Sequence, residues 1–137
     1  MIHAISVRTK PGVDFQDITE EVQEAVSAGG VESGMCFVFV PHTTAAITLN
    51  ENADPAVLED IAARLEAVAP QRGQYHHSEG NGPAHVKASL VGNCVMLLVD
   101  RRRLVLGTWQ GVFLCEFDGP RDRKALVKVM ADAEEKK

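Results

Sequence analysis

GTWQGVFLCEFDGPR, residues 107–121, decides the fold class, because its apolar side chains recur with the two-residue period of a β-strand. One face of this strand is apolar from Trp109 to Phe117, whereas the other face is apolar in its middle and polar at its ends. Such a strand is expected to be covered on both sides, either within the fold or by a partner subunit. The sequence Asp-Gly-Pro at residues 118–120 ends the strand.

The polar positions of this strand indicate a site. Polar side chains are costly to bury unless a partner satisfies them, so the pattern favours a ligand pocket at one or both strand ends. The alternative is a strand edge in water. Trp109, the single tryptophan, is expected to anchor the core, with contact to a substrate as the alternative. The polar residues concerned are Thr108, Gln110 and Glu116.

The remaining segments predict a mainly antiparallel α+β domain with two longer helices and one short helix. The capping and stop signals place a helix from Asp17 to Gly29, a second from Asp54 to Pro70, and a short one from Pro83 to Gly92. Strands are expected over residues 2–8, 35–40, 44–50, 94–99 and 124–130.

Two further expectations concern the arrangement of these segments. The strands over 35–40 and 44–50 are expected to pair through a tight connection, with His42 at the hairpin tip. Residues 1–130 are expected to form the single domain, and residues 131–137 a charged tail.

The composition excludes several classes of protein. A chain of 137 residues with 45% hydrophobic residues forms one core without disulfide or metal staples. A net charge of -5 argues against a general binder of nucleic acid or anionic membranes, because both need a basic surface. No apolar run has the length of a membrane span, and the first residues lack a signal-peptide core. Three cysteines in apolar runs predict buried free thiols and a cytoplasmic location.

Histidines and carboxylates supply the candidate chemistry. His42, His77 and His85 lie in segments rich in other reactive side chains, and imidazoles with a carboxylate or water suit zinc or another divalent ion. The alternative for each histidine is a structural or surface residue, since none has the spacing of a helical zinc pair. Glu51 follows a strand end, where binding loops occur. Asp54 has a sufficient role as a helix cap, with a catalytic role as the alternative.

Strand length restricts how these residues combine. Six residues of strand span about 20 Å, so Gln110 and Glu116 lie at opposite ends of one strand, as do Thr44 and Asn50. Either only the polar groups at one end of these strands act together, or subunits pack so that one end of the strands in one chain meets the other end in a neighbouring chain.

Three segments together resemble the YjbQ family, also called UPF0047: HTTAAITLNENADP at residues 42–55, HVKASLVG at residues 85–92, and LGTWQGVFLCEFDGPR at residues 106–121. The resemblance implies an α+β domain that assembles as a homotrimer with sites at subunit boundaries. It also implies a secondary thiamine-phosphate synthase activity, which joins a pyrimidine methyl diphosphate to a thiazole phosphate and releases pyrophosphate. The alternatives are a metal- or metabolite-binding homotrimer without catalysis and a purely structural assembly protein.

The resemblance and the chemistry of that reaction together assign roles to individual residues. The expected catalytic residues are Asn50, Glu51, Gln110 and Glu116. Asp54, Lys87, Trp109 and Arg121 are expected to bind a phosphorylated small-molecule substrate, with Lys87 and Arg121 neutralising the diphosphate. The expected metal ligands are His42, His77 and His85, with a divalent ion, zinc first, as the cofactor.

Overall fold

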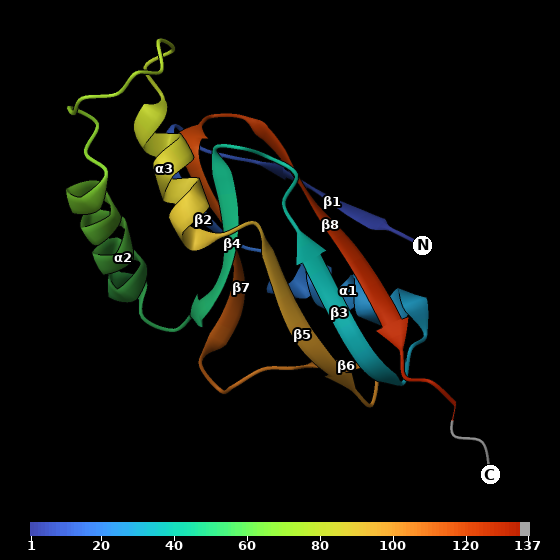
Figure 1. Ribbon diagram of the computed structural model, residues 1–137. Coiled ribbons are helices and arrows are strands. Elements are labelled where there is room, and N and C mark those ends of the chain that lie inside the picture. The colour runs from blue at the N-terminus through green and yellow to red at the C-terminus, as the bar shows by residue number, and fades with distance from the viewer. Residues whose placement is uncertain (135–137) are drawn as a thin grey trace.

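Two antiparallel β-sheets and three helices make up residues 1–134, the part of the chain that the computed structural model describes (Figure 1). The strands are β1 (His3–Arg8), β2 (Gly12–Asp17), β3 (Ser33–Phe39), β4 (Ala45–Glu51), β5 (Cys94–Asp100), β6 (Arg103–Val105), β7 (Gln110–Gly119) and β8 (Asp122–Ala131). The helices are α1 (Thr19–Gly29), α2 (Pro55–Val68) and α3 (Gly82–Val91). The α+β class predicted from the sequence is therefore confirmed.

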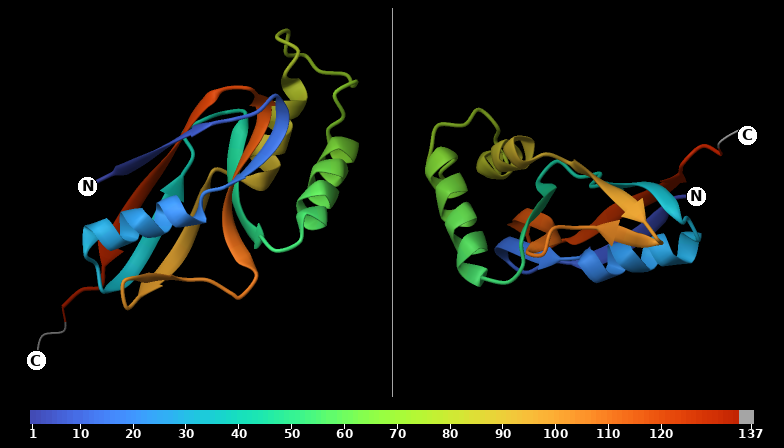
Figure 2. Two further views of the ribbon diagram at one scale, coloured as in Figure 1. Left: turned by 180° about the vertical axis from the view of Figure 1, so that it is seen from behind. Right: turned by 90° about the horizontal axis from the view of Figure 1, so that it is seen from below.

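The five-stranded sheet has the order β1-β8-β3-β5-β6. Its inner face carries small and branched apolar side chains, among them Val38, Val99 and Val127, which pack with Val22 and Val26 of α1 in the main core. Helix α1 crosses this face, as the rear view in Figure 2 shows. The outer face of the same sheet remains uncovered and apolar, with exposed Phe39, Met96, Leu98, Val105 and Met130.

The three-stranded sheet has the order β2-β7-β4, so β7, which contains most of the segment at residues 107–121, is its central strand. Both faces of β7 are buried, as predicted for this strand. Val112 and Leu114 enter the main core, whereas Phe113 and Cys115 enter a second cluster that includes Ala84 and Ala88 of α3.

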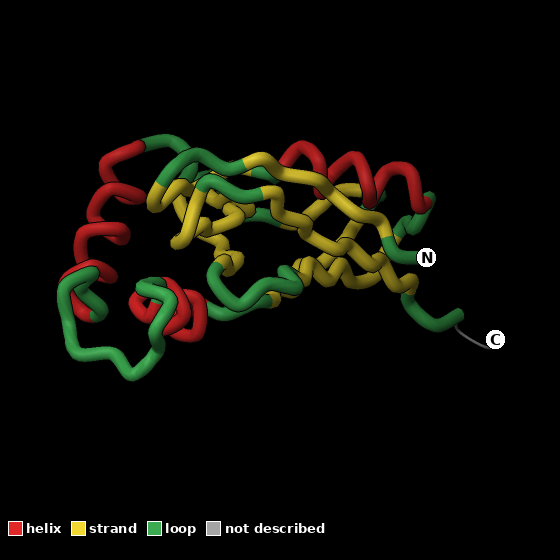
Figure 3. The backbone as a smooth tube through the Cα atoms, turned by 90° about the horizontal axis from the view of Figure 1, so that it is seen from above, coloured by secondary structure: helices red, strands yellow, loops and turns green. Residues whose placement is uncertain are grey.

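Helices α2 and α3 lie together at the end of the molecule opposite both termini, and α3 lies next to the sheets (Figures 1 and 3). Asp54 caps α2 through a hydrogen bond from the backbone N–H of Ala56 to its Oδ1 at 2.9 Å. No side chain of α2 is fully buried, although Leu58 and Leu65 pack against the second cluster. Val68, in the last turn of α2, is exposed, so the apolar side chains of this helix do not form a fully buried stripe.

Several local predictions are corrected. The expected hairpin does not form, because β3 pairs with β5 and β8 while β4 pairs with β7 in the other sheet. His42 lies instead in the connection that crosses between the sheets. Strand β2 was not predicted; it is half-buried, and its sequence GVDFQD gives a weak apolar signal.

Two side chains are more exposed than expected. Trp109 is 62% exposed, in a turn that precedes β7, and therefore does not anchor the core. Cys94 is exposed at the start of β5, whereas Cys36 and Cys115 are buried as predicted. Residues 135–137 of the predicted tail lie outside the described residues. Within residues 1–134, no helix has both the length and the apolar character that crossing a bilayer requires.

Candidate functional site

The candidate site residues fall into two groups at opposite ends of β7. Asn50, Glu51, Trp109 and Gln110 lie at its beginning, where Glu51 is paired with Gln110. His42, His85, Glu116 and Arg121 lie near its end, and His77 lies beside His85. The strand between Gln110 and Glu116 spans about 20 Å, so the two groups do not share a site within one chain.

The polar side chains at the beginning of β7 form local hydrogen bonds. The Gln110 Oε1 accepts from the N–H of Gly107 at 2.8 Å, and the Asn50 Oδ1 accepts from the N–H of Glu51 at 2.7 Å. The N–H of Asn52 donates to the carbonyl of Trp109 at 2.9 Å. These contacts fix the turn before β7 and the segment after β4, whereas the Glu51 carboxylate accepts no hydrogen bond among the described residues.

A polar pocket of about 330 Å³ opens at the other end of β7. The connection from β3 to β4 contributes one wall, the loop before α3 and the first turns of α3 contribute another, and the segment after β7 closes it. The side chains that give the pocket its chemistry are those of His42, Thr43, Glu79, Asn81, His85, Asp118, Arg121 and Arg123.

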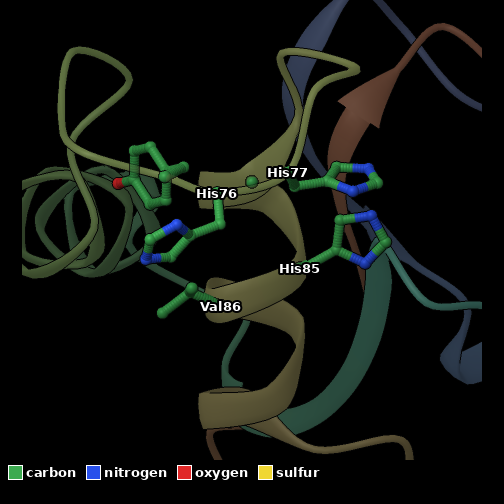
Figure 4. Close-up of a pocket in the computed structure, with 6 residues that line it drawn as sticks. His76, His77, His85 and Val86 are labelled. Carbon is green, nitrogen blue, oxygen red and sulfur yellow. The ribbon is translucent and has the colours of Figure 1, made fainter.

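The imidazoles of His77 and His85, which we call the histidine pair, lie side by side (Figure 4). His85 lines the polar pocket, and both rings line a neighbouring cavity, which Figure 4 shows. Their ring centroids are 5.0 Å apart and the rings meet edge to face at 78°. The Glu79 Oε2 lies 3.7 Å from the His77 Nε2. His76 lies on the other side of α3, towards Val86, and does not belong to the pair (Figure 4).

Glu116 is held in a buried ion pair. The Arg123 Nε donates to one carboxylate oxygen of Glu116 at 2.8 Å and the Arg123 Nη2 to the other at 2.5 Å. The Thr9 hydroxyl donates at 2.6 Å and the N–H of Asp118 at 3.0 Å. Burial raises the pKa of Glu116, but the hydrogen bonds from Arg123 and Thr9 outweigh burial and leave the pKa below its usual value. Glu116 therefore stays ionised and fixed, which suits a structural role rather than proton transfer.

His42 is engaged by the backbone of β8. Its Nε2 accepts a hydrogen bond from the N–H of Lys124 at 2.9 Å, so the proton of the neutral ring is on Nδ1. Burial and the nearby charge of Arg123 lower the pKa of His42, which favours this neutral form. The nitrogen that would bind a metal is therefore already occupied, and His42 offers the pocket a hydrogen-bond donor.

The cations near the pocket are paired with carboxylates. The Arg121 Nη2 lies 3.0 Å from the Asp118 Oδ2, and Arg123 is bound to Glu116. Lys87 forms an ion pair with Glu66 of α2 and lines neither the pocket nor the cavity around the histidine pair. Glu79 and Asp118 line the pocket, and the buried Glu116 neutralises Arg123, so the pocket carries no excess positive charge.

Sequence reasoning missed four residues of this site. Glu79 and Asn81 belong to a loop whose polar composition gave no reason to select them. Asp118 was assigned only to the turn that ends the strand. Arg123 carried a usable signal, because it alternates with Ala125 and Val127 on the inner face of β8, and a cation on a core face needs a buried partner.

A family model described as UPF0047 protein YjbQ-like matches residues 3–132. The chain belongs to the YjbQ/UPF0047 family. It is 44% identical to the UPF0047 protein YugU of Bacillus subtilis over 131 residues, covering 95% of this chain and 99% of that protein. It is 42% identical to a UPF0047 protein of Methanocaldococcus jannaschii, covering 96% of each chain.

Solved structures of YjbQ/UPF0047 proteins have the same fold. The crystal structure of an uncharacterized family member from Clostridium acetobutylicum matches with a TM-score of 0.92 and 51% identity, covering 93% of this chain and 99% of that chain. A YbjQ-like protein of unknown function from Sulfolobus solfataricus matches with a TM-score of 0.92 and 33% identity, covering 96% and 97%.

These comparisons overturn the predicted activity. The relatives are described as uncharacterized or of unknown function, and none supports a thiamine-phosphate synthase, so that assignment is wrong. The site gives a physical reason as well. A diphosphate leaving group needs excess positive charge, whereas Arg121 and Arg123 are neutralised by Asp118 and Glu116, and Lys87 is committed to Glu66.

Proposed function

We propose that this protein binds a divalent metal ion, zinc first, through the imidazoles of His77 and His85 and the carboxylate of Glu79. The observation that carries the proposal is the histidine pair itself, with ring centroids 5.0 Å apart and the Glu79 carboxylate 3.7 Å from the His77 Nε2. Two imidazoles and one carboxylate form a ligand set that zinc accepts while keeping a position for water.

The surroundings support a cation rather than an anion. The pocket beside the pair is lined by two carboxylates and two guanidinium groups, and the buried carboxylate of Glu116 neutralises one of these guanidinium groups, that of Arg123. Glu79 belongs to a loop, so its side chain has room to rotate towards the ring nitrogens. Within residues 1–134, no three histidine, cysteine or acidic side chains already stand at the spacing of a metal site, so binding requires this rotation.

The proposal changes the ligand set that the sequence suggested. Glu79 takes the place of His42 in the proposed ligand set, because the His42 Nε2 already accepts a hydrogen bond from the N–H of Lys124. A bound zinc ion would supply Lewis acidity and lower the pKa of a coordinated water. His42, Asn81 and Arg121 would then hold a small polar molecule in the adjoining pocket by hydrogen bonds.

A metal titration with matched variants tests the proposal. Zinc is added to metal-stripped protein in competition with a chromophoric chelator, and the wild type is compared with His77→Ala, His85→Ala and His3→Ala. His3 is the control, because it lines a different cavity, between the first residues of the chain and α1. We expect the first two variants to lose at least about tenfold in affinity and His3→Ala to match the wild type. Equal affinity in all four proteins would refute the ligand assignment.

We also propose that the chain associates with itself as a homotrimer, with the outer face of the five-stranded sheet in the interface. The support is the row of exposed apolar side chains from four adjacent strands: Phe39, Met96, Leu98, Val105 and Met130. Sedimentation equilibrium of the wild type and of Leu98→Glu tests this, since a charge in the interface should shift the protein to monomer. A monomeric wild type would refute it. The three free cysteines support a cytoplasmic location.

A further inference from the structure

Residues 70–82 form a closed loop that carries one half of the histidine pair. The Gln71 Nε2 donates to the carbonyl of Gly80 at 3.1 Å, which ties the two ends of the loop together. The Tyr75 hydroxyl donates to the carbonyl of Pro70 at 2.5 Å. The Tyr75 ring fills the loop and packs on Gly82, where a Cβ would lie 2.9 Å from the ring carbon Cδ1. His77 is therefore on a loop that is ordered by its own side chains.

His85, the other half of the pair, lies on α3, so something must fix the loop relative to this helix. Glu66 of α2 is hydrogen-bonded both to the loop and to α3. Its Oε1 accepts from the N–H of Gln71 at 2.8 Å, and its Oε2 accepts from the Lys87 Nζ on α3. Lys87 is only 4% exposed although it is a lysine two residues from His85. Burying a charged lysine costs free energy unless it is paired, so the contact with Glu66 offsets the burial of Lys87.

We propose that Lys87 and Glu66 are positioning residues that hold the loop carrying His77 against the helix carrying His85. The proposal deepens the metal-binding function and rests on it for its purpose. The ion pair joins three segments at one carboxylate: α2 through Glu66 itself, the loop through Gln71, and α3 through Lys87. Loss of this junction frees the loop to move away from α3, so that the two imidazoles no longer share one position.

Lys87→Met is the informative variant, because it removes the cation and keeps the length of the side chain. Glu66 is then left half-exposed and can be hydrated, whereas removal of Glu66 would strand a buried cation. Arg64→Met is the matched control, since Arg64 is an exposed cation on α2, the helix that carries Glu66. Glu66→Gln is a second variant, because an amide has one acceptor oxygen and cannot accept from both the Gln71 N–H and Lys87.

The first measurement uses metal-free protein and records the nuclear Overhauser effect between the ring protons of His77 and His85. We expect the wild type and Arg64→Met to show this contact, and Lys87→Met and Glu66→Gln to lose it while circular dichroism remains native. Retention of the contact in both variants would overturn the proposal, as would its absence in the wild type. If Lys87→Met does not fold, Glu66→Gln alone decides.

The second measurement is the affinity of the same proteins for cobalt(II), followed by its visible absorption bands. Residues that orient metal ligands typically contribute about 10- to 100-fold in affinity, so Lys87→Met should bind at least about tenfold more weakly than Arg64→Met. Equal affinities would overturn the positioning role. A wild type that shows the ring contact but binds no cobalt would refute the metal-binding function and leave the positioning of the two rings standing.

Discussion

Replacement of Arg123 by methionine should destabilise the protein strongly, because it leaves Glu116 buried as an unpaired charge. Glu116 is fully buried, and Arg123 provides two of its four hydrogen bonds, at 2.8 and 2.5 Å. Only the contacts from Thr9 and from the N–H of Asp118 would remain. Breaking a buried ion pair from one side costs about 3–5 kcal/mol. For a chain of this length, this free energy corresponds to a fall in Tm of about 12–20 °C.

The cost of Arg123→Met should depend on pH in a defined direction. In the wild type, the pKa of Glu116 is below its usual value. Ionised Glu116 therefore stabilises the folded protein at pH values above the pKa that this carboxyl has in the unfolded chain. This contribution is lost as the pH falls through the pKa of Glu116 in the folded protein. Without Arg123, burial dominates and raises the pKa of Glu116, so protonation stabilises the variant as the pH falls. The difference in stability between the two proteins should therefore narrow from pH 7 to pH 4.

Urea denaturation of the wild type, Arg123→Met and Arg8→Met at both pH values tests this reasoning. Arg8→Met is the control, because Arg8 pairs with Asp122 at 3.2 Å on the surface, where an ion pair contributes about 1 kcal/mol or less. A loss in Arg123→Met no larger than that in Arg8→Met would refute the account of the buried pair. So would a difference that widens towards acid pH.

Three further predictions concern packing and exposure. Gly34→Ala should destabilise the protein by more than about 2 kcal/mol, because a Cβ would lie 1.9 Å from the Met130 carbonyl oxygen, whereas Gly29→Ala, with open space around it, should be neutral or stabilising; chemical denaturation of both variants measures this. Trp109→Ala should change the unfolding free energy by less than about 1 kcal/mol and leave zinc affinity unchanged in the chelator titration, since this side chain is mostly exposed and lies at the far end of β7; a large loss of either would contradict its placement. A thiol reagent should modify Cys94 rapidly in the native protein and the other two cysteines only after unfolding. Burial raises the pKa of the Cys36 thiol to about 11 and that of the Cys115 thiol to about 12. Rapid modification of all three would contradict their burial.

Most of the secondary structure could be predicted because its signals are local. The alternation in residues 107–121, the cap at Asp54 with Pro55, and the left-handed Gly30 after α1 are each determined by a few neighbouring residues. The pairing of β3 with β5 and β8 could not be predicted in the same way. A short connection through Pro41 and Thr43 serves a hairpin and a crossing between sheets equally well, so the sequence does not distinguish them.

The candidate site was predictable in its residue types but not in its grouping. The rise per residue of a strand correctly separated Gln110 from Glu116, because this distance is fixed by backbone geometry. The role of Lys87 was missed, since its partner Glu66 lies on another helix and only tertiary packing brings them together. The same limit applies to His42, whose ring nitrogen is occupied by a backbone N–H from β8.

The most direct test of the central claim is an anomalous difference map at the zinc absorption edge, from crystals grown with zinc. The account predicts one peak per chain within about 2.0–2.2 Å of ring nitrogens of His77 and His85 and of a carboxylate oxygen of Glu79. A map with no peak at the histidine pair, or with zinc bound only at His3 or at lattice contacts, would contradict it.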